Sequence, residues 1–172
     1  MWLAEVSAKA KRHNQILFSK DSLLVDNLRH LIDQANRRAL ILWALELAEE
    51  TVLLLAERYP EDLRPREAIA ASRAWAAGEI KMPFAKRAIL NCHAMAKELI
   101  DFADIARCHA VGQACSVVHT AGHALGYPMY ELTAIVLEQG LDNCRDAVER
   151  RVMYYEKRLR YWTEYEKICQ LN

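Results

Sequence analysis

The hydrophobic and polar positions along this chain follow the period of α-helices. Apolar residues recur at three- and four-residue spacing, and no segment shows the strict alternation that is typical of a half-buried strand. The clearest helix lies at about residues 36–58, where the residues at this spacing are Leu40, Trp43, Ala44, Leu47, Thr51, Leu54 and Leu55. Further apolar residues widen this stripe well beyond one face, so we predict that this helix is central in the fold.

Prolines and glycines indicate where the neighbouring helices begin and end. Pro60 stops the central helix, Pro65 lies where a first-turn proline is tolerated, and Gly78 is a typical C-terminal stop. We predict the other helices at about residues 2–16, 21–34, 65–77, 83–98, 102–125, 128–138 and 142–168. The expected fold is all-α, a compact single-domain bundle of about seven mostly antiparallel helices over residues 1–172.

Charge and composition argue against several classes of function. A chain of 172 residues can bury a large core without disulfides. Lys+Arg and Asp+Glu balance at 23 each, whereas proteins that bind nucleic acid or a membrane surface rely on an excess of basic residues. The most apolar stretch, residues 39–56, contains three glutamates, so we do not expect it to span a membrane. We expect neither a nucleic-acid nor a membrane partner.

The cysteines and the N-terminus indicate a cytoplasmic protein. The five cysteines are odd in number and form no CxxC pair, so a disulfide framework is not expected. Residues 1–5 lack the basic segment and apolar run with which a signal peptide begins.

The predicted C-terminal helix, residues 142–169, has a heptad-like apolar stripe. Its residues are Val148, Val152, Tyr155, Leu159 and Trp162, spaced alternately by four and three. Packing against the rest of the same domain is the favoured interpretation. Self-association or a partner helix is the alternative, because Tyr154, Tyr161 and Tyr165 lie off this stripe and tyrosines suit recognition surfaces.

One cysteine and two histidines are candidates for a metal site. Cys115, His119 and His123 follow one another at four-residue spacing, which predicts one helix face if the helix continues to residue 125. Eight residues of helix rise about 12 Å, so one metal ion could bind only an adjacent pair of them. We therefore favour buried, hydrogen-bonded histidines over a metal site, and we expect no cofactor.

Charged residues on and after the central helix form a second group of candidates. Glu46, Glu50 and Glu57 share a narrow arc of the helix, with Glu49 at its edge. The segment that follows contains Arg64, Arg66, Arg73 and Trp75. For the acids we favour two interpretations, a solvated face or pairing with arginines, and a helical hairpin would bring these arginines close enough to pair. Anion binding at the start of the next helix and acid–base chemistry are the alternatives.

These residues also belong to an ordered series of motifs. The series is Trp43-Ala44, Ala48-Glu49, Arg64-Pro65-Arg66 with Ala68-Ile69, Arg73-Ala74-Trp75 with Gly78-Glu79, His93-Ala94, Gly112-Gln113 and His119-x-x-x-His123-Ala124. It resembles a family of small helical bacterial immunity proteins from polymorphic-toxin systems, over residues 36–137. Leu45, Leu47, Cys108 and Cys115 depart from the residues expected in that family.

The resemblance implies a protein that binds and neutralises a cognate toxin, without catalysis. The rival hypothesis is a small-molecule or metal-binding protein, or an enzyme, with an internal polar pocket. A structural or oligomerising protein that assembles through the C-terminal helix is the third. The binding or network residues expected from the series and its charges are Glu46, Glu49, Arg64, Arg66, Arg73, Trp75, His93, Gln113, His119 and His123.

Overall fold

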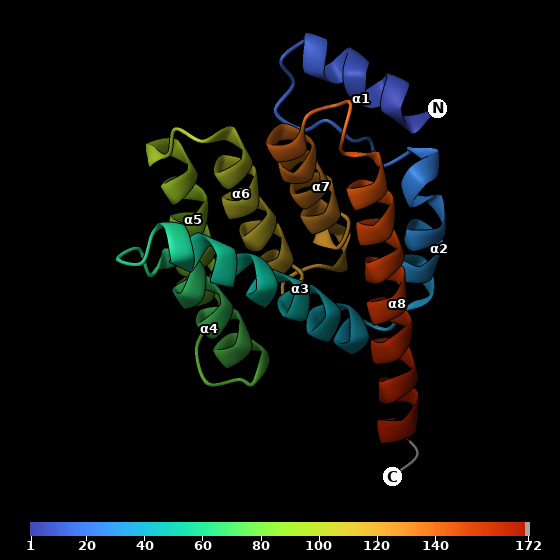
Figure 1. Ribbon diagram of the computed structural model, residues 1–172. Coiled ribbons are helices and arrows are strands. Elements are labelled where there is room, and N and C mark those ends of the chain that lie inside the picture. The colour runs from blue at the N-terminus through green and yellow to red at the C-terminus, as the bar shows by residue number, and fades with distance from the viewer. Residues whose placement is uncertain (171–172) are drawn as a thin grey trace.

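Helices joined by short connections make up the fold (Figure 1). The structure is a computed structural model that describes residues 1–170. The eight α-helices in that range are α1 (Trp2–Lys11), α2 (Asp26–Gln34), α3 (Arg37–Arg58), α4 (Arg64–Ala76), α5 (Met82–Met95), α6 (Phe102–Ser116), α7 (Gly126–Gln139) and α8 (Arg145–Gln170). Short 3₁₀ helices are η1 (Leu23–Val25), η2 (Ala96–Glu98) and η3 (Ala121–His123). The described residues contain no strand, so the predicted all-α class is confirmed.

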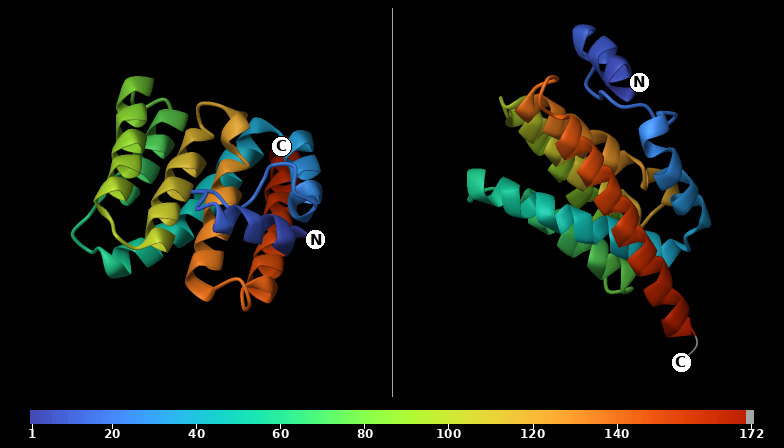
Figure 2. Two further views of the ribbon diagram at one scale, coloured as in Figure 1. Left: turned by 90° about the horizontal axis from the view of Figure 1, so that it is seen from above. Right: turned by 45° about the vertical axis from the view of Figure 1, so that its right-hand side comes forward.

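The helix α3 crosses the others and holds them together. The helices α4 to α8 run up and down beside one another, and α3 passes obliquely across one face of this row (Figures 1 and 2). It packs against α4, α6 and α8. Asn36 caps its start by accepting a hydrogen bond from the Ala39 backbone N–H at 2.8 Å. Trp43 and Leu47 are fully buried, which confirms the central position that the sequence predicts.

One hydrophobic cluster extends from α1 to α8. It includes Val6 near the N-terminus and Leu159 in the last helix. Val148, Val152, Tyr155 and Leu159 are buried in it, and α8 contacts α2, α3 and α7. The heptad-like stripe of the last helix therefore packs within its own chain, as we favoured from the sequence.

Two glycines end helices where the sequence predicts ends. Gly78 follows α4 with φ +77°, and Gly140 follows α7 with φ +80°. A positive φ costs glycine little, because glycine has no Cβ to approach the following carbonyl oxygen.

Two predicted helices are too long. The first ends at Lys11 instead of residue 16, and His13 adopts φ +55° in the turn that follows. The predicted helix to Leu125 is also wrong, because α6 ends at Ser116. Thr120 is extended and its hydroxyl accepts a hydrogen bond from the Gly122 backbone N–H at 3.4 Å, which starts η3 instead.

Candidate functional site

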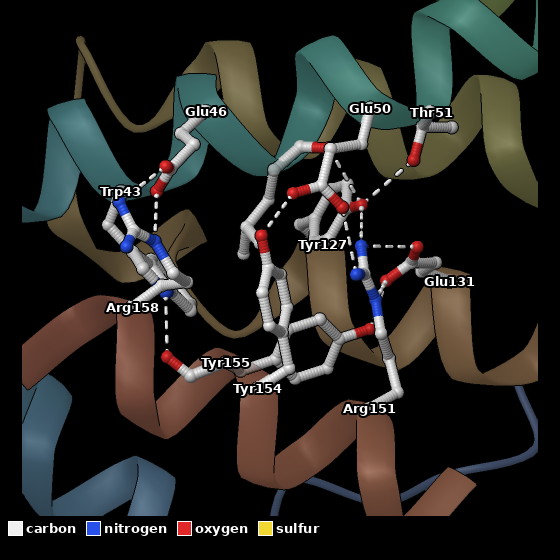
Figure 3. A network of polar contacts seen from close by, with 11 residues as sticks. Trp43, Glu46, Glu50, Thr51, Tyr127, Glu131, Arg151, Tyr154, Tyr155 and Arg158 are labelled. Atoms are coloured by element: carbon white, nitrogen blue, oxygen red, sulfur yellow. Dashed lines mark hydrogen bonds and ion pairs between the residues drawn. The ribbon is translucent and has the colours of Figure 1, made fainter. Parts of the chain in front are cut away.

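The acids of the central helix pair with arginines of the last helix (Figure 3). Glu46 accepts hydrogen bonds from Arg158 at 2.6 and 3.1 Å and from the Trp162 indole N–H at 2.7 Å. Nearby, the indole of Trp43 donates to the carbonyl oxygen of Tyr155 at 3.0 Å. Pairing with an arginine was one of the two interpretations we favoured, but the partner comes from α8 and not from the predicted hairpin.

A partly buried charge network continues along the same interface, as Figure 3 shows. Arg151 donates to Glu131 at 2.8 and 2.9 Å and to Glu50 at 2.8 Å. The Tyr154 hydroxyl donates to Glu50 at 2.5 Å, and the Tyr155 hydroxyl donates to Glu131. One guanidinium thus joins α3, α7 and α8.

Burial and neighbouring charges set the charge states of the residues in this network. Burial by itself would lower the pKa of Arg151, but Glu131 and the neighbouring tyrosines raise it far above the ordinary value. Burial raises the pKa of Tyr127 and Tyr155 well above that of a free phenol. Arg151 therefore stays charged and the phenols stay neutral at physiological pH. The ion pairs of Arg151 join α8 to α3 through Glu50 and to α7 through Glu131.

The three arginines predicted as one group, Arg64, Arg66 and Arg73, have different surroundings in the structure. Arg73 pairs with Glu49 at 2.5 Å, and both side chains are about half exposed. This is the ion pair that the sequence suggests between the central helix and the next one. Arg66 is exposed on α4. Arg64 lies at the start of α4 and pairs with two other carboxylates instead.

Arg64 is held by two carboxylates at once. Asp62 accepts from it at 2.6 and 2.9 Å, and Glu98 of η2 accepts at 2.7 and 2.8 Å. The hydrogen bond to Glu98, then that to Asp62, raises the pKa of Arg64 above its ordinary range. The loop before α4 is thus fastened to the segment before α6.

A second charge cluster, centred on Asp104, was not predicted from the sequence. Asp104 on α6 accepts from Arg58 and Arg107 at 2.9 Å each and from the Tyr59 hydroxyl at 2.9 Å. Both arginines also reach Glu138 at the end of α7, at 2.8 and 2.7 Å. Burial would raise the pKa of Asp104, but the hydrogen bonds of these partners lower it. The sequence feature that could have indicated this cluster is the Asp104 and Arg107 pair, three residues apart in the otherwise apolar segment 103–118.

Trp75 and His119 form a pair of their own. Their ring centroids are 4.8 Å apart. Both ring nitrogens of His119 are shielded from solvent and have no hydrogen-bond partner among the described residues. Burial, followed by His123 and two cations, lowers the pKa of His119, so the ring is neutral.

His93 and His109 face each other between α5 and α6. Their Nδ1 atoms are 2.8 Å apart, so one of them donates a proton and the other accepts it. The Gln15 amide lies 3.4 Å from Nε2 of His109, and the Tyr130 ring lies 5.2 Å from the His109 ring. Burial, then His109 and His123, lowers the pKa of His93 to about 4.

Gln113 lies one helical turn beyond His109 on α6, and its side chain meets His123. The Nδ1 atom of His123 lies 3.0 Å from the Gln113 side-chain oxygen. A Cβ at Gly126 would fall within 3.0 Å of three Gln113 atoms, so glycine is needed for this approach. A shallow cleft of about 410 Å³ opens beside them, and its other polar lining residues include Lys20 and Thr120.

The structure does not place the metal candidates on one helix face. Cys115 is buried near the end of α6, His119 lies beyond that end, and His123 belongs to η3. Burial raises the pKa of the Cys115 thiol to about 12, so this sulfur is a poor metal ligand and a poor nucleophile. Within residues 1–170 no three histidine, cysteine or acidic side chains are grouped to hold a metal ion.

The candidate residues therefore do not line one shared pocket. Glu46 lies against α8, Glu49 and Arg73 form a surface pair, and Gln113 and His123 border the small cleft. The rival hypothesis needs these residues around one internal pocket, whereas their contacts divide them between these separate places.

Comparison of the sequence with known families identifies the family of this chain. The sequence profile of the family described as Imm-5 like putative immunity protein matches residues 30–158. The chain belongs to this Imm-5 like family. The match includes α3 to α7 and the first half of α8, and with them the candidate residues between Glu46 and His123, whereas α1 and the second half of α8 lie outside it.

The other comparisons add no relative. No curated protein and no solved structure matches this member of the Imm-5 like family. Among the helices of residues 1–170, none combines the length and the apolar character needed to cross a membrane.

Proposed function

We propose that this chain is an immunity protein that binds a cognate protein toxin and blocks its action, without catalysing a reaction. The observation that carries the proposal is the family match over residues 30–158, which is three quarters of the chain. The earlier resemblance rests on motifs within the same range, so the two lines of evidence concern the same residues.

The arrangement of polar side chains supports a binding role. The candidate acids and arginines are used in pairs that join helices, as Arg151 and Arg158 do between α8 and its neighbours. Such pairs make a rigid scaffold, and a rigid surface loses little conformational entropy when it binds a partner. We further propose that the protein acts in the cytoplasm, where its five free thiols would stay reduced.

Co-expression provides the test. Each toxin domain encoded beside this gene would be induced in cells with and without the chain, and growth would be measured. We expect rescue by the wild-type chain from one of these toxins, together with a stable complex on size-exclusion chromatography. Absence of both rescue and complex with every neighbouring toxin would contradict the proposal.

We also propose that the predicted single domain, residues 1–172, folds as one unit, because one hydrophobic cluster joins α1 to α8; residues 171–172 lie outside the described residues. This predicts a single cooperative unfolding transition by both circular dichroism and tryptophan fluorescence. Two separate transitions would show two units.

Self-association through the end of α8 is the second candidate. Tyr161 and Tyr165 are exposed there, and their rings stack with centroids 6.4 Å apart. Light scattering of the wild-type chain and of a Tyr161→Ser/Tyr165→Ser variant would test it. A dimer in the wild type that the variant loses is the expected result, and a monomeric wild type would exclude it.

A further inference from the structure

One end of the molecule exposes large apolar side chains to solvent. Ile100 is 92% exposed, Phe102 is 73% exposed, and Leu63 is 51% exposed. Ile100 and Phe102 line a shallow hollow of about 600 Å³ with Tyr59, and Leu63 lines an adjacent hollow of about 470 Å³. Single exposed apolar residues are ordinary, but a group of them on adjoining hollows is typical of an interaction surface.

Acidic residues surround these apolar side chains. Segments 57–67 and 97–104, which we call the acidic end, carry seven carboxylates and four basic residues, whereas the whole chain is neutral. Two of the four basic residues, Arg58 and Arg64, already contact two carboxylates each. The exposed carboxylates of this end are Glu57, Glu61, Glu67, Glu98 and Asp101. The acidic end therefore carries a formal net charge of −3, from seven carboxylates and four basic residues, around its exposed apolar side chains.

Hydrogen bonds fix the segment that presents Ile100 and Phe102. Asp101 caps α6 by accepting from the Asp104 backbone N–H at 2.9 Å. On the other side, Glu98 is bound by both terminal nitrogens of Arg64. The two apolar side chains between these attachments are held outward at a hydration cost. A partner that covers them would gain this free energy without having to order the segment first.

We propose that the acidic end is the surface that binds the toxin, and that the toxin presents a cationic face with an apolar centre to it. This inference rests on the proposed function. Opposite charge would steer the two proteins together and raise the association rate, while burial of Ile100 and Phe102 would slow dissociation. A cationic working surface is what a toxin needs if its substrate is a nucleic acid, since phosphates are bound by basic residues.

The same charges oppose pairing between two copies through this end. A two-fold symmetric contact places each surface against itself, so the carboxylates of both copies would face one another. Self-association through the acidic end would therefore be weakened by repulsion, and a basic partner is the occupant that the charges favour.

Surface plasmon resonance with the wild-type chain and the catalytically inactivated toxin domain encoded beside its gene tests the inference. The charge variant is Glu61→Lys/Glu67→Lys, and the apolar variant is Ile100→Ala/Phe102→Ala. We expect the charge variant to lower the association rate constant about tenfold at low salt. We expect the apolar variant to raise the dissociation rate constant at least about tenfold.

Matched controls lie on the opposite side of the molecule from α4 and α5, on α2 and α8 (Figures 1 and 2). Asp33→Lys reverses an exposed charge on α2, and Met153→Ala truncates an exposed apolar side chain on α8. Both should leave both rate constants within about twofold of the wild type. Urea unfolding midpoints of all four variants should match the wild type, because every changed side chain is exposed.

The outcomes separate the two proposals. If the wild type binds the toxin and both acidic-end variants bind equally well, the surface assignment is wrong and the immunity function stands. Association that does not weaken with added salt would also overturn it. If the wild type binds none of the toxins encoded beside it, the proposed function fails and this inference fails with it.

Discussion

At the scale of single residues, close approach between helices depends on glycine, which has no side chain. Gly112 lies on α6 against the ring of His93, and a Cβ there would fall within 3.0 Å of three ring atoms. Gly122 lies ten residues later, and a Cβ there would meet Thr120 at 3.7 Å, an ordinary contact. Both glycines stand in the segment predicted as one helix, so the sequence does not distinguish them.

Replacing Gly112 with alanine should destabilise the protein. The added methyl group would displace the His93 ring from its contact with His109, at a cost of about 1–3 kcal/mol in the free energy of unfolding. Urea denaturation measures the loss.

The matched control is Gly122→Ala, which should change the free energy of unfolding by less than about 0.5 kcal/mol. The double variant Gly112→Ala/His93→Ala should be less destabilised than the two single losses added together, because the clash is gone. Equal stability of the two glycine variants would contradict the steric account.

Buried and exposed ion pairs should respond differently to loss of one charge. Glu131→Gln leaves the largely buried guanidinium of Arg151, whose side chain is 19% exposed, without its main counter-charge, and we expect a loss of about 3 kcal/mol in the free energy of unfolding. Glu49→Gln removes the surface pair with Arg73 and should cost less than about 1 kcal/mol. Urea denaturation of both variants makes the comparison, and similar losses would show that the buried network is not integral to the fold.

At the scale of helices, the sequence predicts a helix end correctly where a capping or glycine residue marks it, and wrongly where tertiary packing ends the helix. The sequence places the start of α3 at about residue 36, where the structure has the Asn36 cap, and it places the end of α4 at Gly78. The roles of Asn36 and Gly78 depend on their own side chain or the lack of one. The end of α6 carries no such signal. Helical spacing continues to His123, but residues 117–118 are buried in the turn and Thr120 is extended.

The cap of α3 gives a prediction at this scale. Asn36→Ala removes the acceptor for the Ala39 backbone N–H and should lower the free energy of unfolding by about 1 kcal/mol. Asn36→Asp keeps an acceptor and should stay within about 0.3 kcal/mol of the wild type. If both variants are equally stable in thermal denaturation, the cap makes no contribution.

At the scale of the whole molecule, charge pairs and neutral histidines together make stability depend on pH. The pKa of His93 is lowered to about 4 in the folded state from an ordinary value of 6.5. Between these two values the unfolded chain binds more protons than the folded chain. Stability that is complete above pH 6.5 is therefore lost as the pH falls toward 4. The lowered pKa values of Asp62 and Asp104 add a further loss at still lower pH.

The variant His93→Gln should flatten this dependence. Urea midpoints measured at pH 7.5, 6.0 and 5.0 should fall less steeply in the variant than in the wild type, because one proton uptake on unfolding is removed. The control Gln34→Ala changes an exposed, uncharged side chain on α2 and should keep the wild-type slope. Parallel curves for His93→Gln and the wild type would show that His93 is not responsible.

The sequence by itself determined the helical class, the central position of residues 36–58, most helix ends and the motifs of the family, because periodicity, capping residues and motif spacing are local properties of the chain. Only the tertiary structure decided the partners. Glu46 is bound by Arg158, 112 residues away, and Arg64 is shared between Asp62 and Glu98. Which side chains pair depends on how whole helices pack, and the local sequence does not show which distant residues this packing brings together. The acidic end arises in the same way, because the fold brings segments 57–67 and 97–104 together.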